Sequence, residues 1–134
     1  MHPTRNTLTL AIREQSVGLL NKHLASAIDL PAQLKQAHWN VRGPGFIAVH
    51  ELFDRVSTDV ELYSDLIAER ARGIGGAAHG TIQIAVERSF LVPYPLDVGD
   101  VAQHLFAVSG ALAAFGPAVR EADAQSAAYG EGTT

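Results

Sequence analysis

The amino-acid sequence predicts an all-α helical bundle. Three long stretches carry apolar residues spaced by three and four, which is the period of an amphipathic helix that buries one face. Glycine and proline gather mainly between these stretches, where they end helices or form turns. The chain has 134 residues and a mass of 14.3 kDa, with 47% hydrophobic and 18% charged residues. We therefore expect one domain over 1–134 with a modest hydrophobic core.

The first long helix is predicted over 8–38. Its apolar residues recur at helical spacing: Val17, Leu20, Leu24, Ala27 and Leu34. Pro31 lies inside this pattern, and an interior proline removes a backbone hydrogen bond and costs roughly 3 kcal/mol. The segment Asp29-Leu30-Pro31 is equally suited to start a new helix. The sequence therefore predicts a kink or a break at Pro31.

The second long helix is predicted over 47–72 and has the clearest pattern. Its apolar seam alternates spacings of three and four through Phe53, Val56, Val60, Tyr63 and Ile67. Such a seam packs against neighbouring helices. Gly75-Gly76 is expected to end the helix.

A short element near 81–86 and a third long helix over 98–123 follow. The apolar alternation of the short element fits a strand and a helical turn equally well. The third long helix has a seam of Val101, Leu105, Val108, Leu112, Phe115 and Val119. Gly116-Pro117 is predicted to bend or end it. The two ends of the chain, 1–7 and 125–134, are expected to be flexible.

Composition excludes several classes of function. The absence of cysteine excludes disulfides, thiolate metal sites and cysteine nucleophiles. The formal net charge of −4 gives no general attraction to nucleic acid. The N-terminus lacks the apolar core of a signal peptide, and no apolar run approaches membrane-spanning length. We therefore expect a cytoplasmic protein without a membrane partner.

Five residues with metal-binding side chains lie at the end of the first predicted helix and along the second: His38, His50, Asp54, Asp65 and Glu69. Residues four apart share a helix face, so His50 pairs with Asp54, and Asp65 with Glu69. Three turns, on the order of 16 Å, separate Asp54 from Asp65. One chain therefore cannot place both pairs on one ion. Two copies can, if their second helices pack antiparallel about a two-fold axis near Asp59 and Val60.

The residue types indicate which metals such a site would take. Two imidazoles with several carboxylates suit Fe(II), Mn(II) or Zn(II) better than Ca(II) or Mg(II), which prefer oxygen ligands alone. Bridging carboxylates suit a di-iron centre and stabilise Fe(III). An alternative stays open at this point, because acidic residues along a helix are typical of a solvated face and a lone His-x-x-x-Asp is a weak signal.

One block of sequence resembles a known family, the DNA-binding proteins from starved cells (Dps), which are miniature ferritins. The resemblance rests on Lys35-Gln36-Ala37-His38-Trp39-Asn40-Val41-Arg42-Gly43-Pro44-Gly45-Phe46, Val49-His50-Glu51-Leu52-Phe53-Asp54 and Asp65-Leu66-Ile67-Ala68-Glu69-Arg70. It extends more weakly over 8–124. The His-Trp-Asn and His-Glu-x-x-Asp block is highly specific for this family.

The resemblance implies a ferritin-like fold and an iron site between subunits. By motif position, His38, His50 and Asp54 match ligands from one subunit, and Asp65 and Glu69 match ligands from its partner. Trp39 matches an aromatic residue beside the centre that donates electrons, although a core anchor between helices is an equally good interpretation. The family forms hollow dodecamers that oxidise Fe(II), preferably with hydrogen peroxide, and store a ferric mineral. We expect the family's fourth long helix to be missing here.

Two other functions compete with a ferroxidase that has a di-iron centre. One is a non-catalytic iron-binding or structural subunit, and the other is a nucleoid-associated protein that binds DNA. Relatives that condense DNA use lysine-rich tails, because phosphate contacts supply most of the non-specific affinity. Here the N-terminal arm has only Arg5 and Arg13, and no Lys or Arg follows Arg120. Strong DNA binding is therefore not expected.

Overall fold

The computed structural model describes residues 1–4 and 8–128. These residues form four helices: α1 (Leu10–Asn40), α2 (Phe46–Gly73), α3 (Ile82–Arg88) and α4 (Val101–Ala128). No strand is present in this part of the chain, where one isolated bridge joins Arg42 and Asp100. The predicted all-α class is confirmed. Residues 5–7 and 129–134, which belong to the ends expected to be flexible, lie outside the described ranges.

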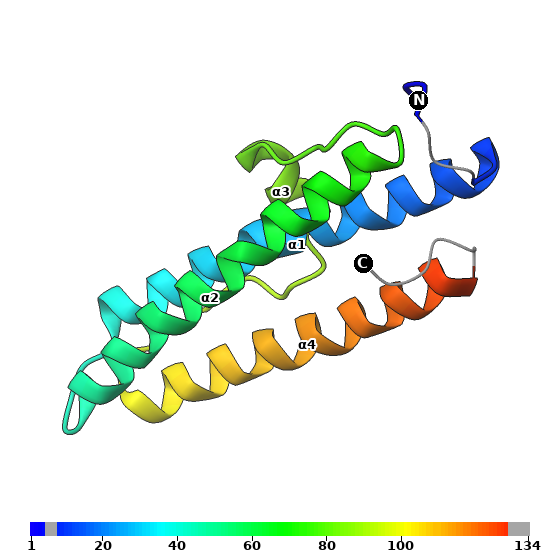
Figure 1. Cartoon of the computed structure of the whole chain (residues 1–134). Helices are drawn as coiled ribbons and strands as arrows, with labels where there is room; N and C mark the ends of the chain where they lie inside the picture. The colour runs from blue at the N-terminus through cyan, green and yellow to red at the C-terminus, as the bar shows by residue number, and fades with distance from the viewer. Residues whose placement is uncertain (5–7, 129–134) are drawn as a thin grey trace.

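The helices form an antiparallel pair with one further long helix beside it. α1 and α2 run side by side in opposite directions, α4 lies along α1, and the short α3 packs against α1 (Figure 1). The three predicted long helices are all present, at 10–40, 46–73 and 101–128. Within 1–4 and 8–128 no fourth long helix occurs.

α1 is one unbroken helix, so the predicted break at Pro31 is wrong. It starts at the N-cap Thr9, whose hydroxyl accepts a hydrogen bond from Ile12 N at 3.2 Å. Leu30 and Leu34, on either side of the proline, are almost completely buried. The Pro31 carbonyl also accepts a hydrogen bond from the Ser57 hydroxyl of α2 at 3.0 Å. Tertiary packing on both sides therefore offsets the missing backbone hydrogen bond.

Glycines set both ends of α2. Gly43 and Gly45 have φ values of 100° and 76°, and Gly45 is the N-cap of the helix. Positive φ is readily adopted by glycine, so this turn can be tight. At the other end Gly75, with φ 94°, donates its N–H to the Arg72 carbonyl. The predicted termination by Gly75-Gly76 is confirmed, with the last helical residue at Gly73.

The short element at 81–86 is the helix α3, not a strand. The hydroxyl of Thr81 caps it by accepting a hydrogen bond from Ile84 N at 3.3 Å. The loop before α3 is held on α1 by Asn21, whose side chain bonds to Ala77 O at 2.9 Å and to His79 N at 2.8 Å. The Thr81 cap and the hydrogen bonds of Asn21, more than the alternation of apolar residues, therefore account for a helix at this position.

α4 begins with a reciprocal cap and continues past its internal proline. The Asp100 carboxylate accepts from Gln103 N at 2.8 Å, and the Gln103 side chain accepts from Asp100 N at 3.3 Å. The prediction that Gly116-Pro117 ends the helix is wrong, since α4 runs to Ala128. Pro117 deprives the Ala113 carbonyl of its helical partner, but both residues are exposed, so water can replace that bond.

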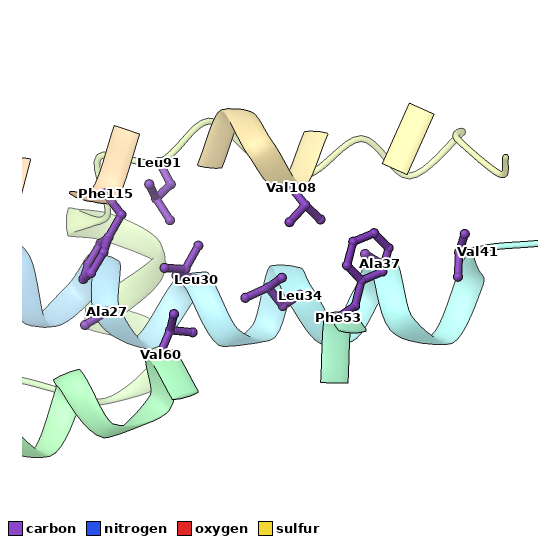
Figure 2. Close-up of a cluster of buried hydrophobic side chains, with 10 residues drawn as sticks. All are labelled: Ala27, Leu30, Leu34, Ala37, Val41, Phe53, Val60, Leu91, Val108 and Phe115. Carbon is purple, nitrogen blue, oxygen red and sulfur yellow. The ribbon is translucent and has the colours of Figure 1, made fainter. Parts of the chain in front are cut away.

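The core forms between α1, α2 and α4. Leu30, Leu34 and Phe53 are at most 1% exposed and occupy its centre (Figure 2). The other buried members are Ala27, Ala37, Val41, Val60, Leu91, Val108 and Phe115. Phe53 and Val60 of the seam predicted for the second helix are buried and Val56 and Ile67 are partly buried, whereas Tyr63 is 45% exposed.

A hydrogen bond between Tyr94 and the buried His104 anchors the loop before α4. The Tyr94 hydroxyl lies 2.6 Å from His104 Nδ1, and the two rings are stacked with centroids 5.8 Å apart. His104 is 1% exposed, and its Nε2 has no hydrogen-bond partner among the described residues. Burial lowers the pKa of the His104 imidazole below its ordinary 6.5 and raises the pKa of the Tyr94 hydroxyl to about 12.

α4 is unusually apolar for a helix with an exposed face. Its segment Val101–Ala118 is long and apolar enough to cross a membrane by length and composition, and few of its residues are buried. The expectation that no apolar run reaches this length is therefore wrong. The same test is passed by helices of soluble proteins. Here α4 contributes Val108 and Phe115 to the core shared with α1 and α2.

Candidate metal centre

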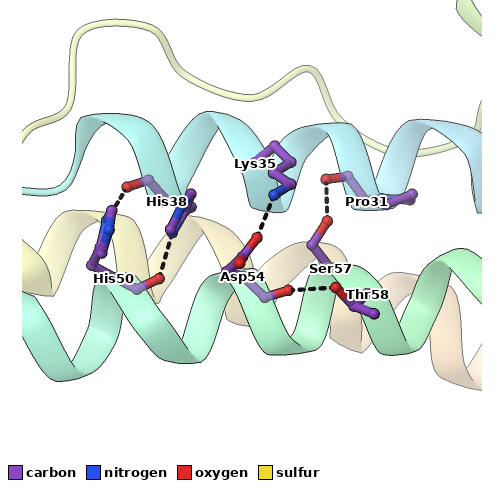
Figure 3. Close-up of polar contacts among 7 residues, drawn as sticks. All are labelled: Pro31, Lys35, His38, His50, Asp54, Ser57 and Thr58. Carbon is purple, nitrogen blue, oxygen red and sulfur yellow. Dashed lines mark hydrogen bonds and ion pairs between the residues drawn. The ribbon is translucent and has the colours of Figure 1, made fainter.

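The end of α1 and the start of α2 bring three of the five predicted ligands together. The tight turn at Gly43 and Gly45 reverses the chain, so the antiparallel helices face one another immediately after it. His38 from α1 lies against His50 from α2, and Asp54 follows one turn further along α2 (Figure 3). His38 and His50 are therefore in contact, and the assignment of these three residues as metal ligands stays a prediction.

The two imidazoles hold each other in place through reciprocal hydrogen bonds. His38 Nδ1 lies 2.6 Å from the His50 carbonyl, and His50 Nδ1 lies 2.6 Å from the His38 carbonyl (Figure 3). Their rings are stacked, with centroids 3.8 Å apart and planes 18° apart. A carbonyl only accepts hydrogen bonds, so each Nδ1 carries the proton. In the neutral ring, each Nε2 then keeps its lone pair for a metal ion.

Asp54 already has a cationic partner within the same chain. Lys35 Nζ on α1 forms an ion pair and hydrogen bond with Asp54 Oδ1, and both side chains are partly exposed (Figure 3). The hydrogen bond from Lys35 lowers the pKa of the Asp54 carboxyl below its ordinary 3.8, and the nearby histidines act in the same direction. Asp54 is thus held ionised, and an incoming cation has to compete with an ammonium for one of its oxygens.

Asp65 and Glu69 lie apart from this group. Both are exposed on α2, and three helical turns separate Asp65 from Asp54. Among the described residues, no group of three or more His, Asp or Glu side chains is placed to hold a metal ion. One chain therefore presents the five predicted ligands as two separate sets.

Trp39 is largely exposed on one chain. It is 69% exposed, although it directly follows His38 near the end of α1. The interpretation of Trp39 as a core anchor between helices is therefore wrong. An exposed indole beside a set of potential metal ligands is unusual for a monomer, because aromatic side chains gain most from burial.

Two neighbours of the histidines, Lys35 and Phe46, are not among the residues that the sequence predicts for the site. Lys35 precedes His38 by three residues and so shares its helix face, a spacing that could have identified it. Phe46 packs its ring edge-on against His50, with centroids 6.1 Å apart. Phe46 is the first residue of α2, and nothing in its periodicity distinguishes it from an ordinary core position.

The fold and this pair of helices define a ferritin-like protein. The model of the ferritin-like domain family matches residues 17–110. Among solved structures, DpsC from Streptomyces coelicolor superposes with a TM-score of 0.88 at 29% identity, covering 96% of this chain and 75% of that one. Mycobacterium smegmatis Dps gives a TM-score of 0.86 at 30% identity, covering 93% and 71%.

Sequence comparison narrows the assignment further. The chain is 40% identical over 133 residues to the DNA protection during starvation protein of Agrobacterium fabrum, covering 99% of this chain and 82% of the relative. The chain belongs to the Dps family of the ferritin-like superfamily.

Proposed function

We propose that this protein is an iron-binding ferroxidase of the Dps type. It oxidises Fe(II) with hydrogen peroxide or oxygen at a di-iron site that two copies of the chain share. The observation that carries the proposal is the reciprocal bonding of His38 and His50, which leaves Nε2 of each neutral ring as a metal donor. Family membership supports the same reading, a protective iron-binding role.

The donor set fits Fe(II) as the substrate. Imidazole nitrogen suits iron, and carboxylate oxygen holds the ferric product more tightly than the ferrous substrate because it is anionic. Two Fe(II) ions each give up one electron. With two protons, those two electrons reduce one hydrogen peroxide to two water molecules. The chain's own part is to hold both ions close together and to keep Asp54 ionised through Lys35.

The second half of each site comes from the partner copy in this proposal. In an antiparallel pairing of two α2 helices about a two-fold axis near Asp59 and Val60, Asp65 and Glu69 face Asp54 and His50 of the other copy. Leu62 and Leu66 lie beside those carboxylates and are 63% and 61% exposed. Exposed leucines next to a row of ligands favour a contact with another surface there.

Trp39 has a catalytic role in this scheme. It adjoins His38 in the sequence and is exposed on the single chain, so a partner copy is available to cover it. We assign to it the donation of an electron to oxidising species formed near the iron, which limits their escape. The self-associating protein acts on Fe(II) and hydrogen peroxide in the cytoplasm. Whether it encloses a stored mineral depends on the size of the assembly.

The first test measures Fe(III) formation by absorbance after Fe(II) and hydrogen peroxide are mixed with the protein. His50→Ala and Asp65→Ala are both expected to lose most of the activity. Asp97→Ala removes an exposed carboxylate from the loop before α4 and is expected to keep the wild-type rate. Iron binding without oxidation by the wild type would instead indicate a non-catalytic iron-binding subunit.

The second test asks whether the site is shared between copies. His50→Ala and Asp65→Ala subunits are unfolded together and refolded as a mixture. Heterodimers then hold one complete site and one site that lacks two ligands. Activity is expected to recover to about a quarter of the wild-type rate, because half of the dimers are mixed and each has one of two sites intact. No recovery, with mixed dimers confirmed by native mass spectrometry, would refute the shared site.

A further inference from the structure

The His38 carbonyl at the end of α1 does not have its helical hydrogen-bond partner. In an α-helix each N–H bonds to the carbonyl four residues earlier, so the last carbonyls need donors from elsewhere. The Ala37 carbonyl still accepts from Val41 N at 3.0 Å. The next donor along the chain is Arg42 N, whose helical partner would be the His38 carbonyl. That carbonyl instead lies 2.6 Å from His50 Nδ1.

The loop before α4 holds Arg42 N in a different hydrogen bond. Arg42 N donates to the Gly99 carbonyl at 2.9 Å. Gly99 is itself tied to the first turn of α4, because its N–H donates to the Gln103 side chain at 3.1 Å. Val41 is buried in the core, and its extended backbone, with φ −63° and ψ 135°, takes the chain out of the helix just before Arg42. The α1–α2 turn is thus joined to the start of α4.

Glycine at position 99 allows this close approach. Gly99 is buried, and a Cβ built on it would collide with the Arg42 guanidinium. The guanidinium therefore occupies the space that a side chain at position 99 would take. Any larger residue there has to displace Arg42, and a branched side chain also crowds the backbone of the turn.

We propose that the hydrogen bond from Arg42 N to Gly99 positions the histidines of the candidate metal centre. If Arg42 N were free, α1 could continue through it. A second donor would then compete with His50 Nδ1 for the His38 carbonyl, and the chain would turn toward α2 at a later residue. Held by Gly99, Arg42 N leaves that carbonyl to the His50 imidazole, which keeps its proton on Nδ1 and its Nε2 lone pair available. The inference rests on the proposed function only in assigning metal binding to Nε2.

The first experiment measures the tautomer of His50 in the metal-free protein by nitrogen-15 NMR of labelled histidine. Gly99→Val and Gln103→Ala both weaken the contact with Arg42. Each is expected to shift the ratio of Nδ1–H to Nε2–H in His50 about five-fold toward Nε2–H, the effect of losing one ordinary hydrogen bond. Gly110→Val is the control, since nothing lies within 4 Å of a Cβ at Gly110. It is expected to keep the wild-type ratio.

His38 is an internal reference in the same spectra, because its Nδ1 lies against the His50 carbonyl of α2 and not against a carbonyl at the end of α1. The His38 ratio is therefore expected to change less than that of His50. Circular dichroism checks that the variants keep their helical content. An unchanged His50 ratio in folded Gly99→Val and Gln103→Ala would overturn the proposal, as would an equal shift of both histidines.

The second experiment isolates the Arg42 N–H by comparing Arg42→Pro with Arg42→Ala, each combined with Gln103→Ala. Both remove the guanidinium, but only proline lacks the backbone N–H, and the extended Val41 has the conformation that suits a following proline. Arg42→Pro is expected to return the His50 ratio to the wild-type value, because no N–H then competes for the His38 carbonyl. Arg42→Ala is expected to leave the ratio shifted. Equal ratios in the two double variants would contradict a role for Arg42 N.

Fe(II) oxidation links the tautomer to the proposed function. With hydrogen peroxide, Gly99→Val is expected to form Fe(III) about five-fold more slowly than Gly110→Val, in proportion to the lost Nδ1–H tautomer. A wild-type rate in Gly99→Val despite a shifted tautomer would overturn the positioning role. Absence of oxidation by the wild type would contradict the proposed function alone, because the NMR comparison on the metal-free protein still decides whether Arg42 and Gly99 position His50.

Discussion

At the scale of single residues, the candidate site depends on contacts that cross from α1 to α2. Helical spacing predicts that His50 and Asp54 share a face, and the motif adds His38 at the end of the preceding helix. Spacing within one helix does not state what lies opposite, so the ion pair of Lys35 with Asp54 and the stacking of the imidazoles follow only from the fold. Among the described residues of one chain, no other set of metal-binding side chains lies with Asp65 and Glu69.

Replacing Lys35 by methionine tests its effect on Asp54. The hydrogen bond from Lys35 is the main cause of the lowered pKa of Asp54, so this pKa is expected to rise toward 3.8 in Lys35→Met. Because the pKa of this carboxyl is lower in the folded protein than in the unfolded chain, its ionisation stabilises the fold at pH values above the ordinary pKa. That contribution disappears as pH falls through the folded-state pKa. Carbon-13 NMR titration of the carboxyl measures the change.

Lys22→Met is the matched control, because Lys22 is an exposed lysine of the same helix. It is expected to leave the Asp54 titration as in the wild type. An unchanged Asp54 pKa in Lys35→Met would show that the ion pair does not persist in solution.

The buried His104, which contacts Tyr94, is expected to make the stability of the protein depend on pH. Burial lowers the pKa of His104, so the unfolded chain takes up a proton near pH 6.5 before the folded protein does. Stability is therefore expected to fall as pH drops below 6.5, until the folded-state pKa is reached. Urea unfolding at several pH values measures this slope, and it should be shallower in His104→Gln. Parallel slopes for the two proteins would contradict the assignment to His104.

At the scale of whole elements, sequence patterns located the helices better than they located interruptions. The periodicity of apolar residues indicates which face of a helix is buried, and Phe53 and Val60 of the predicted face are buried in the structure. A proline in a sequence indicates only a local loss of helix stability of roughly 3 kcal/mol. Buried neighbours and the bond from Ser57 outweigh that cost at Pro31. The short element at 81–86 was ambiguous because six residues are too few to distinguish a period of 2 from one of 3.6.

Pro31→Ala is expected to stabilise the protein by about 1–3 kcal/mol, because it restores a backbone hydrogen bond inside a helix that is already continuous. Without proline the unfolded chain has greater conformational freedom, and this reduces the gain in stability by about 0.4–1 kcal/mol. Urea unfolding at neutral pH provides the measurement. A decrease in stability would mean that the pyrrolidine ring fills space in the α1–α2 contact that alanine leaves empty.

At the scale of the whole molecule, charge and apolar surface favour self-association over nucleic acid. Fourteen acidic residues exceed ten basic ones, so the mean field repels phosphate. Exposed apolar side chains recur on α2 at Leu62 and Leu66 and on α4 at Phe106. A sequence shows which residues are apolar, but it does not show which of them remain outside the core. The proposed contact face on α2 could therefore be identified only from the folded chain.

The reciprocal hydrogen bonds of His38 and His50 also depend on the register of α1 against α2. Sliding α2 along α1 by one residue displaces each carbonyl by about 1.5 Å, which breaks bonds of this length. Both bonds run between the same two residues, so they fail together, and each ring is then free to move its proton to the other nitrogen. A misaligned hairpin would thus present the wrong nitrogen to a metal. At the proposed site, metal affinity is consequently expected to depend on how accurately α1 and α2 pack against each other.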